Sequence, residues 1–180
     1  MTGPDALAVL ERRPDLVFHV SEEAGIARFE PRPMPRHPGN AVWAIDAAHL
    51  PHYLLPRDCP RACWARGAAT TEADAARFAS SAPRVIAVEW AWLARIRRTR
   101  LHVYAFDAAP FAPLDDIAGY VISRVGVTPV AVAEVDDTLR ALAAREVELR
   151  IVPSLWPLHD AIAASSLDFS IIRMRNAAPR

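Results

Sequence analysis

Short apolar runs separated by turn-forming residues dominate the sequence, and they predict a series of short strands and helices. Residues 16–20 combine branched and aromatic apolar side chains, which is typical of a strand. Residues 84–89 are apolar on both faces and predict a central strand. Further strands are expected at residues 41–45, 59–65, 101–106, 120–123, 128–135, 149–152 and 169–175.

Helical periodicity, with capping residues at the right places, predicts the helices. A short leading helix at about residues 4–13 ends before Pro14, because proline cannot continue it. Thr70 or Thr71 caps a helix over residues 71–78, and Asp136 and Asp137 cap one over residues 138–145. Further helices are expected at residues 47–55, 90–98 and 155–165.

The order of these elements predicts the fold class. Crossover helices do not separate the strands regularly, so a Rossmann or barrel fold is not expected. The sequence predicts an α+β fold with small mixed or antiparallel sheets and flanking helices. At 180 residues, without an internal repeat or a composition break, the chain is interpreted as one domain spanning residues 1–180.

Composition excludes several classes of function. The 21 basic and 21 acidic residues cancel, and every basic residue is arginine. Without lysine, Schiff-base enzymes and P-loop nucleotide hydrolases are excluded. Zero net charge argues against bulk nucleic-acid binding, which needs an excess of positive charge. The arginines at positions 95, 97, 98 and 100 lie at the end of a predicted helix, where cations oppose the negative end of the helix dipole. A phosphate or RNA contact is the alternative.

The N-terminal residues, the most apolar segment and the two cysteines predict the cellular compartment of the protein. Residues 1–5 do not resemble a signal peptide, and Glu89 interrupts the most apolar segment, so no membrane span is expected. Cys59 and Cys63 lie too close in sequence for a useful disulfide and are expected to be reduced thiols. We therefore predict a cytoplasmic protein.

Two local groups could hold a metal ion or a nucleophile. His49 and His52 could share a helical face, but a zinc site recruits further ligands, so no metal site is predicted. Cys59 lies near arginines that would favour its thiolate, and a buried, inert thiol is the favoured alternative.

A dispersed set of residues predicts a ligand site. A pocket for an anionic or nucleotide ligand needs arginine donors, an orienting hydroxyl or imidazole, and an aromatic face. Four segments supply these groups: the end of the first strand, the proline-rich loop of residues 30–39, the following helical turn and a polar corner. The candidate ligand-binding residues are His19, Ser21, Arg36, His37, Tyr53, Arg57 and Asp58. The alternative is structural: Arg57 and Asp58 cap one loop, and Arg36 pairs with Glu22 or Glu23.

Several distinctive segments stand at residues 18–33, 42–46, 53–61, 85–90, 98–104, 115–124, 153–161 and 168–176. In these segments, which together extend from Phe18 to Asn176, the chain resembles a bacterial family of uncharacterised proteins. More distantly, the strand ending in His19 and Ser21, the later Tyr53 and the late VTPVAV strand resemble the ADP-ribosyltransferase-like fold. That resemblance implies two small split sheets around a cleft for nicotinamide adenine dinucleotide (NAD). It also implies that His19 binds the adenosine ribose and that Tyr53 stacks on nicotinamide.

The resemblance is incomplete at the catalytic position. Transferases of this kind usually carry a glutamate that opens a late strand, whereas residues 118–121 read AGYV. Asp115, Asp116 and Glu134 are the neighbouring acids. Two functions therefore stay open: an ADP-ribosyltransferase-like enzyme, with NAD as its cofactor or substrate, and a non-catalytic ligand-binding or interaction module. A further open interpretation is that the apolar segments with Trp90, Trp92 and Trp156 form the interface of a homodimer.

Overall fold

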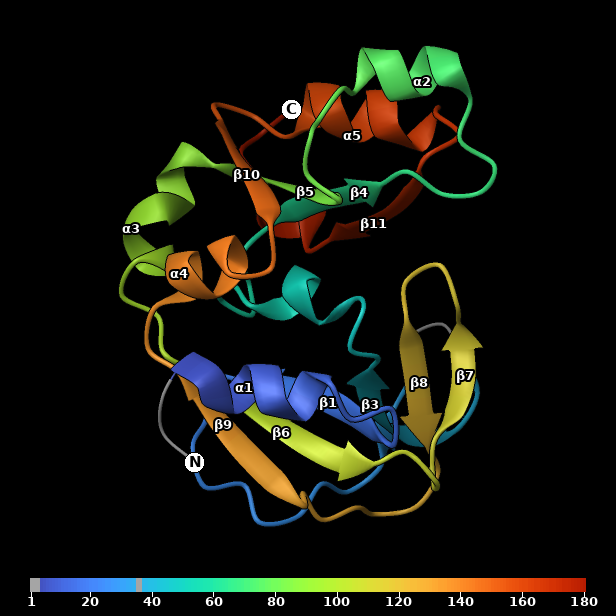
Figure 1. Cartoon of the computed structure of the whole chain (residues 1–180), viewed down its shortest axis with the longest axis vertical. Coiled ribbons are helices and arrows are strands. Elements are labelled where there is room, and N and C mark those ends of the chain that lie inside the picture. The colour runs from blue at the N-terminus through green and yellow to red at the C-terminus, as the bar shows by residue number, and fades with distance from the viewer. Residues whose placement is uncertain (1–3, 35–36) are drawn as a thin grey trace. The chain divides into compact units, whose positions relative to one another are not determined.

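The computed structural model describes residues 4–34 and 37–180, and it divides into two compact units, each built from two stretches of chain (Figure 1). Unit 1 comprises Met1–Leu54 and Arg100–Asp136, and unit 2 comprises Leu55–Thr99 and Asp137–Arg180. Neither unit is a continuous segment, and the expectation of one domain stays a prediction. The expected α+β class is confirmed, because each unit combines a small sheet with helices.

Unit 1 contains a seven-stranded sheet with the strand order β7-β8-β3-β1-β6-β9, in which β2 pairs with β3. Every pairing in it is antiparallel. The strands are β1 (Leu16–Ser21), β2 (Arg32–Pro33), β3 (Asn40–Ile45), β6 (Leu101–Asp107), β7 (Ala112–Asp115), β8 (Tyr120–Ser123) and β9 (Ala131–Val135). The helix α1 (Pro4–Glu11) contacts β9, and a 3₁₀ turn, η1, spans Leu50–Tyr53.

Two regions of unit 1 differ from the sequence-based expectation. The proline-rich segment contributes a two-residue strand, β2, where a loop without pairing was expected. The ladder stays short because Pro33 has no N–H to donate. The expected helix over residues 47–55 is only the 3₁₀ turn η1, which has Pro51 in its first turn.

Unit 2 contains a four-stranded sheet with the order β10-β5-β4-β11, in which only the pairing of β10 with β5 is parallel. Its strands are β4 (Arg61–Ala65), β5 (Arg84–Glu89), β10 (Val147–Val152) and β11 (Asp168–Ile172). Its helices are α2 (Glu72–Arg77), α3 (Leu93–Ile96), α4 (Thr138–Ala143) and α5 (Trp156–Ala163), with 3₁₀ turns η2 (Trp90–Trp92) and η3 (Met174–Asn176).

The strand β5 is central, as the sequence predicts, and residues 85–89 are all buried. Glu89 is only 2% exposed because its carboxylate accepts hydrogen bonds from the backbone N–H groups of Leu155 and Ala178. The predicted caps are also confirmed. The Thr71 side chain accepts from Asp74 N at the start of α2, and the Asp137 side chain accepts from Arg140 N at the start of α4.

The helix predicted over residues 90–98 is shorter than expected. The chain forms η2 and then the four-residue α3, and among residues 90–96 of these two elements only Ile96 is buried. Trp90 is 57% exposed. An apolar stripe that could hold a longer helix against the sheet is therefore missing. In the part of the chain that the structure describes, no helix is both long enough and apolar enough to cross a membrane.

Candidate functional site

Four ring side chains of unit 1 form a continuous series, which we call the aromatic row: His37, Trp43, Tyr120 and Tyr53. The ring centroids of consecutive members lie 6.4, 5.3 and 6.1 Å apart. The Tyr53 hydroxyl also donates a hydrogen bond to the Tyr120 hydroxyl. His37 is exposed and the other three are half-buried, so the row offers aromatic surface to a ligand.

The pairing of β3 with β8 creates the centre of the row. Trp43 lies opposite Ile122, and Tyr120 lies opposite Ile45. Trp43 and Tyr120 are thus diagonal neighbours on one face of the sheet. Tyr53 reaches Tyr120 from the end of η1, where the preceding residues Leu50, Pro51 and His52 are buried and fix the turn.

Arg124 fixes the segment that carries His37. Its Nη1 atom donates to the carbonyl oxygens of Pro38 and Asn40, each at 3.1 Å. Gly39 has φ +82°, and a Cβ added there would lie 3.0 Å from the same Nη1 atom. The predicted ligand residue Arg36 lies outside the described residues.

A carboxylate–imidazole pair adjoins the row. His49 Nδ1 lies 2.8 Å from Asp46 Oδ1, and the His49 backbone N–H donates to the same oxygen at 2.8 Å. A carboxylate only accepts hydrogen bonds, so it holds the proton of the imidazole on Nδ1. The ring packs on Gly119, the residue before Tyr120. Within the described residues, no three or more histidine, cysteine or acidic side chains gather as a metal site would require.

Arg32 lies close to Trp43 through the short strand β2. It is directly opposite Ala41, and Ala41 and Trp43 share a face of β3. Its side chain is exposed, and within the described part of the chain it forms no ion pair. A guanidinium and the aromatic row therefore lie on the same side of the sheet.

The predicted residues His19 and Ser21 face the other side of that sheet. His19 Nδ1 lies 2.9 Å from the Trp43 carbonyl oxygen, and its ring centroid lies 4.9 Å from that of Phe29. Phe18 is paired with Ile45, so strand alternation groups His19 with Ala44 and not with Trp43. The Ser21 hydroxyl accepts from the Glu23 N–H at 3.0 Å.

The predicted residues Arg57 and Asp58 belong to unit 2. The Arg57 carbonyl accepts from Arg173 Nε at 3.4 Å, and the Asp58 carbonyl accepts from Asn176 Nδ2 at 2.7 Å. This corner thus holds the C-terminal segment through its backbone. Of the predicted ligand residues, the structure brings His37 and Tyr53 to the two ends of one aromatic row.

Sequence reasoning missed Trp43 and Tyr120, which lie at the centre of the row. Both stand in predicted strands, where an aromatic side chain is as consistent with a core position as with a site. An aromatic residue within each of two short neighbouring strands was the available signal, but the register that brings the two together is not local.

The cysteines are buried free thiols, as expected. Burial raises the pKa of Cys59 to about 12, and burial likewise raises the pKa of Cys63 to about 12. Both therefore stay protonated near neutral pH, which argues against a nucleophilic Cys59 thiolate.

Comparison with known proteins identifies the family. A family of unknown function, DUF6886, matches residues 18–177. This is nearly the whole chain, so the protein belongs to that family. No curated protein and no solved structure matches it.

Proposed function

We propose that unit 1 of this DUF6886 protein binds a nucleotide or dinucleotide-like anionic ligand at the aromatic row. The observation that carries the proposal is the row itself, which joins His37 and Tyr53 through Trp43 and Tyr120. Aromatic side chains that keep part of their surface exposed favour stacking with a flat base.

Arg32 supports the anionic part of the proposal. It is the diagonal neighbour of Trp43 on the same face, and its guanidinium is exposed. Arginine forms paired hydrogen bonds with phosphate oxygens, and the chain has no lysine to take that role. A ligand with a ring on the row and a phosphate at Arg32 fits both groups, and NAD is the dinucleotide that the fold resemblance suggests.

The residue at the start of β8 favours a binding module over an enzyme. There the strand carries Tyr120, whose hydroxyl accepts a hydrogen bond from Tyr53, and not the glutamate that a transferase of the resembled kind would use. We therefore propose binding as the primary function and ADP-ribosyl transfer as the second candidate. His19, Ser21, Arg57 and Asp58 stay predictions for either function.

Titration calorimetry with ADP, adenosine and NAD tests the proposal. We expect saturable binding of ADP and NAD, and Arg32→Gln should weaken ADP binding by roughly 3- to 10-fold while leaving adenosine unchanged. Arg13→Gln is the matched control, because Arg13 is an exposed arginine of the same unit that pairs with Asp15. The proposal fails if none of the three compounds binds, or if Arg13→Gln and Arg32→Gln have equal effects.

Incubation with NAD labelled in the nicotinamide ring separates the two candidates. Binding without release of nicotinamide identifies a ligand-binding module. Release of nicotinamide, lost in a Tyr53→Ala variant that still folds, identifies the enzyme.

A further inference from the structure

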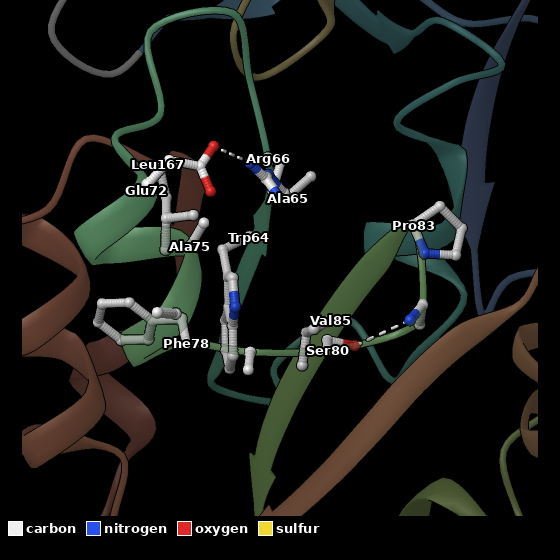
Figure 2. A pocket seen from close by; sticks show the side chains of 13 residues that line it. Trp64, Ala65, Arg66, Glu72, Ala75, Phe78, Ser80, Pro83, Val85 and Leu167 are labelled. Atoms are coloured by element: carbon white, nitrogen blue, oxygen red, sulfur yellow. Dashed lines mark hydrogen bonds and ion pairs between the residues drawn. The ribbon is translucent and has the colours of Figure 1, made fainter.

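Unit 2 contains a cavity of about 370 Å³ beside β4, β5 and α2 (Figure 2). All of its lining residues belong to unit 2. Trp64, Phe78 and Val85 form apolar walls, and Ala75 and Ala76 of α2 line it with methyl groups only. The volume lies in the range of small-molecule sites, which is about 300–1,000 Å³.

The indole of Trp64 lies between Phe78 on one side and Val85 on the other (Figure 2). Trp64 is 2% exposed, and its Nε1 atom is buried without an acceptor among the described residues. One ring face lies 5.1 Å from Arg150 Cζ, measured to the ring centroid. An indole nitrogen only donates, and buried donors nearly always have an acceptor. This N–H has almost no accessible surface, so the indole contributes ring surface to the lining and not a donor.

Arg66 supplies a donor at the rim of the cavity. It pairs with Glu72 at 2.7 Å, and the two side chains are 63% and 89% exposed (Figure 2). An ion pair as exposed as this contributes little stability, so a carboxylate of a ligand can replace Glu72. Trp64 and Arg66 are two positions apart along β4 and its immediate continuation, so both side chains lie on the same side.

The remaining polar group of the lining is already satisfied. The Ser80 hydroxyl donates to Glu148 and accepts from Ala82 N at 3.0 Å. The group left for a ligand is thus the Arg66 guanidinium above an apolar floor. We propose that this cavity binds a small apolar carboxylate, with its ring or short alkyl chain against Trp64 and Phe78 and its carboxylate at Arg66. This site is separate from the nucleotide site proposed in unit 1.

Nuclear magnetic resonance of the ¹⁵N-labelled full chain tests the proposal with benzoate and hexanoate as probes. The chain has five tryptophans, and the indole signal of Trp64 is the one missing from a Trp64→Phe variant. We expect a saturable shift of that signal, because the bound probe lies against the indole ring of Trp64. Benzamide, the neutral counterpart of benzoate, should bind more weakly.

Two charge variants test the role of the carboxylate. Arg66→Gln should weaken benzoate binding by about fivefold, the fold-change for roughly 1 kcal/mol at a partly exposed pair. Glu72→Gln should tighten it, because the competing carboxylate is removed. Neither variant should change the binding of benzamide.

Filling the cavity provides the steric test. Ala75→Leu should abolish the shift of the Trp64 signal, and Ala76→Leu, at an exposed lining position, gives the same test if Ala75→Leu does not fold. Ala73→Leu is the matched control, because Ala73 is an exposed alanine of α2 outside the lining. The proposal is overturned if neither probe shifts the Trp64 signal, if the filled variants bind like the wild type, or if benzamide binds as tightly as benzoate.

Discussion

Replacing Gly119 with alanine tests the packing of the Asp46–His49 pair beside the aromatic row. Gly119 has φ +70°, a left-handed conformation that side chains rarely adopt. A Cβ added there would lie 2.3 Å from His49 Nδ1 and 2.7 Å from His49 Cβ. Both distances are shorter than any ordinary contact, so the substitution must displace the imidazole as well as strain the backbone.

The structure separates the two contributions. The left-handed conformation costs an alanine about 1–2 kcal/mol. Displacing His49 also breaks its hydrogen bond to Asp46, which contributes about 0.5–1.5 kcal/mol to stability. Because the Asp46 side chain is 42% exposed, we expect the lower part of that second range. Gly119→Ala should therefore lower the free energy of unfolding by about 1.5–3 kcal/mol.

Gly25 is the matched control for the backbone contribution. It has φ +72°, and a Cβ added there meets nothing within 4 Å. Gly25→Ala should therefore lower the free energy of unfolding only by the conformational cost, about 1–2 kcal/mol. The difference between the two variants measures the contact with His49.

Urea unfolding followed by circular dichroism provides the assay, with equal slopes required for the comparison. In a His49→Gly background the clash is absent, because the His49 Cβ is removed together with the ring, so Gly119→Ala should destabilise the protein no more than Gly25→Ala does. Equal destabilisation by the two glycine variants in the wild-type background would refute the reasoning. So would an unchanged effect of Gly119→Ala after His49 is removed.

Three further predictions concern unit 2. Because burial raises the pKa of both Cys59 and Cys63 to about 12, neither thiol should react with Ellman's reagent at neutral pH until denaturant is added; rapid labelling of the native protein would contradict this. Hydrogen bonds from Ser166 hold the pKa of Asp74 in the folded protein below its ordinary value. The ionised Asp74 side chain therefore stabilises the fold at pH values above its pKa in the unfolded chain, and this contribution is lost as the pH falls through its pKa in the folded protein. The stability gap between the wild type and Asp74→Asn, measured as urea midpoints from pH 7 to pH 3, should therefore shrink below about pH 4, and a constant gap would argue against it. Glu89→Gln replaces one acceptor oxygen with a donor that faces a backbone N–H, so it should lower the free energy of unfolding by about 1–3 kcal/mol, measured by thermal unfolding. An unchanged melting temperature would show that the Glu89 carboxylate does not stabilise the fold through these hydrogen bonds.

The parts of the fold that depend on local patterns could be predicted from the sequence. A continuous apolar run identifies β5 as a central strand, and the residues Thr71 and Asp137 mark helix starts because their side chains cap the backbone at short range. The segment after β5 could not be predicted in the same way. Its helical propensity is sufficient for a helix, but only Ile96 is buried there, and tertiary packing decides the length of a helix.

The composition of the site depends on a non-local quantity, the register between strands. His19 and Trp43 both lie in strands that the sequence predicts, yet one step along β3 decides whether a side chain shares the face of His19 or that of Tyr120. Register also brings Arg32 beside Trp43, since only the pairing of β2 with β3 connects the proline-rich segment to the sheet. The lack of lysine limits an anion site in unit 1 to arginine, histidine and backbone N–H donors. Because Arg124 is engaged with the carbonyls of the proline-rich segment, the register makes Arg32, among the residues that the structure describes, the guanidinium beside the row.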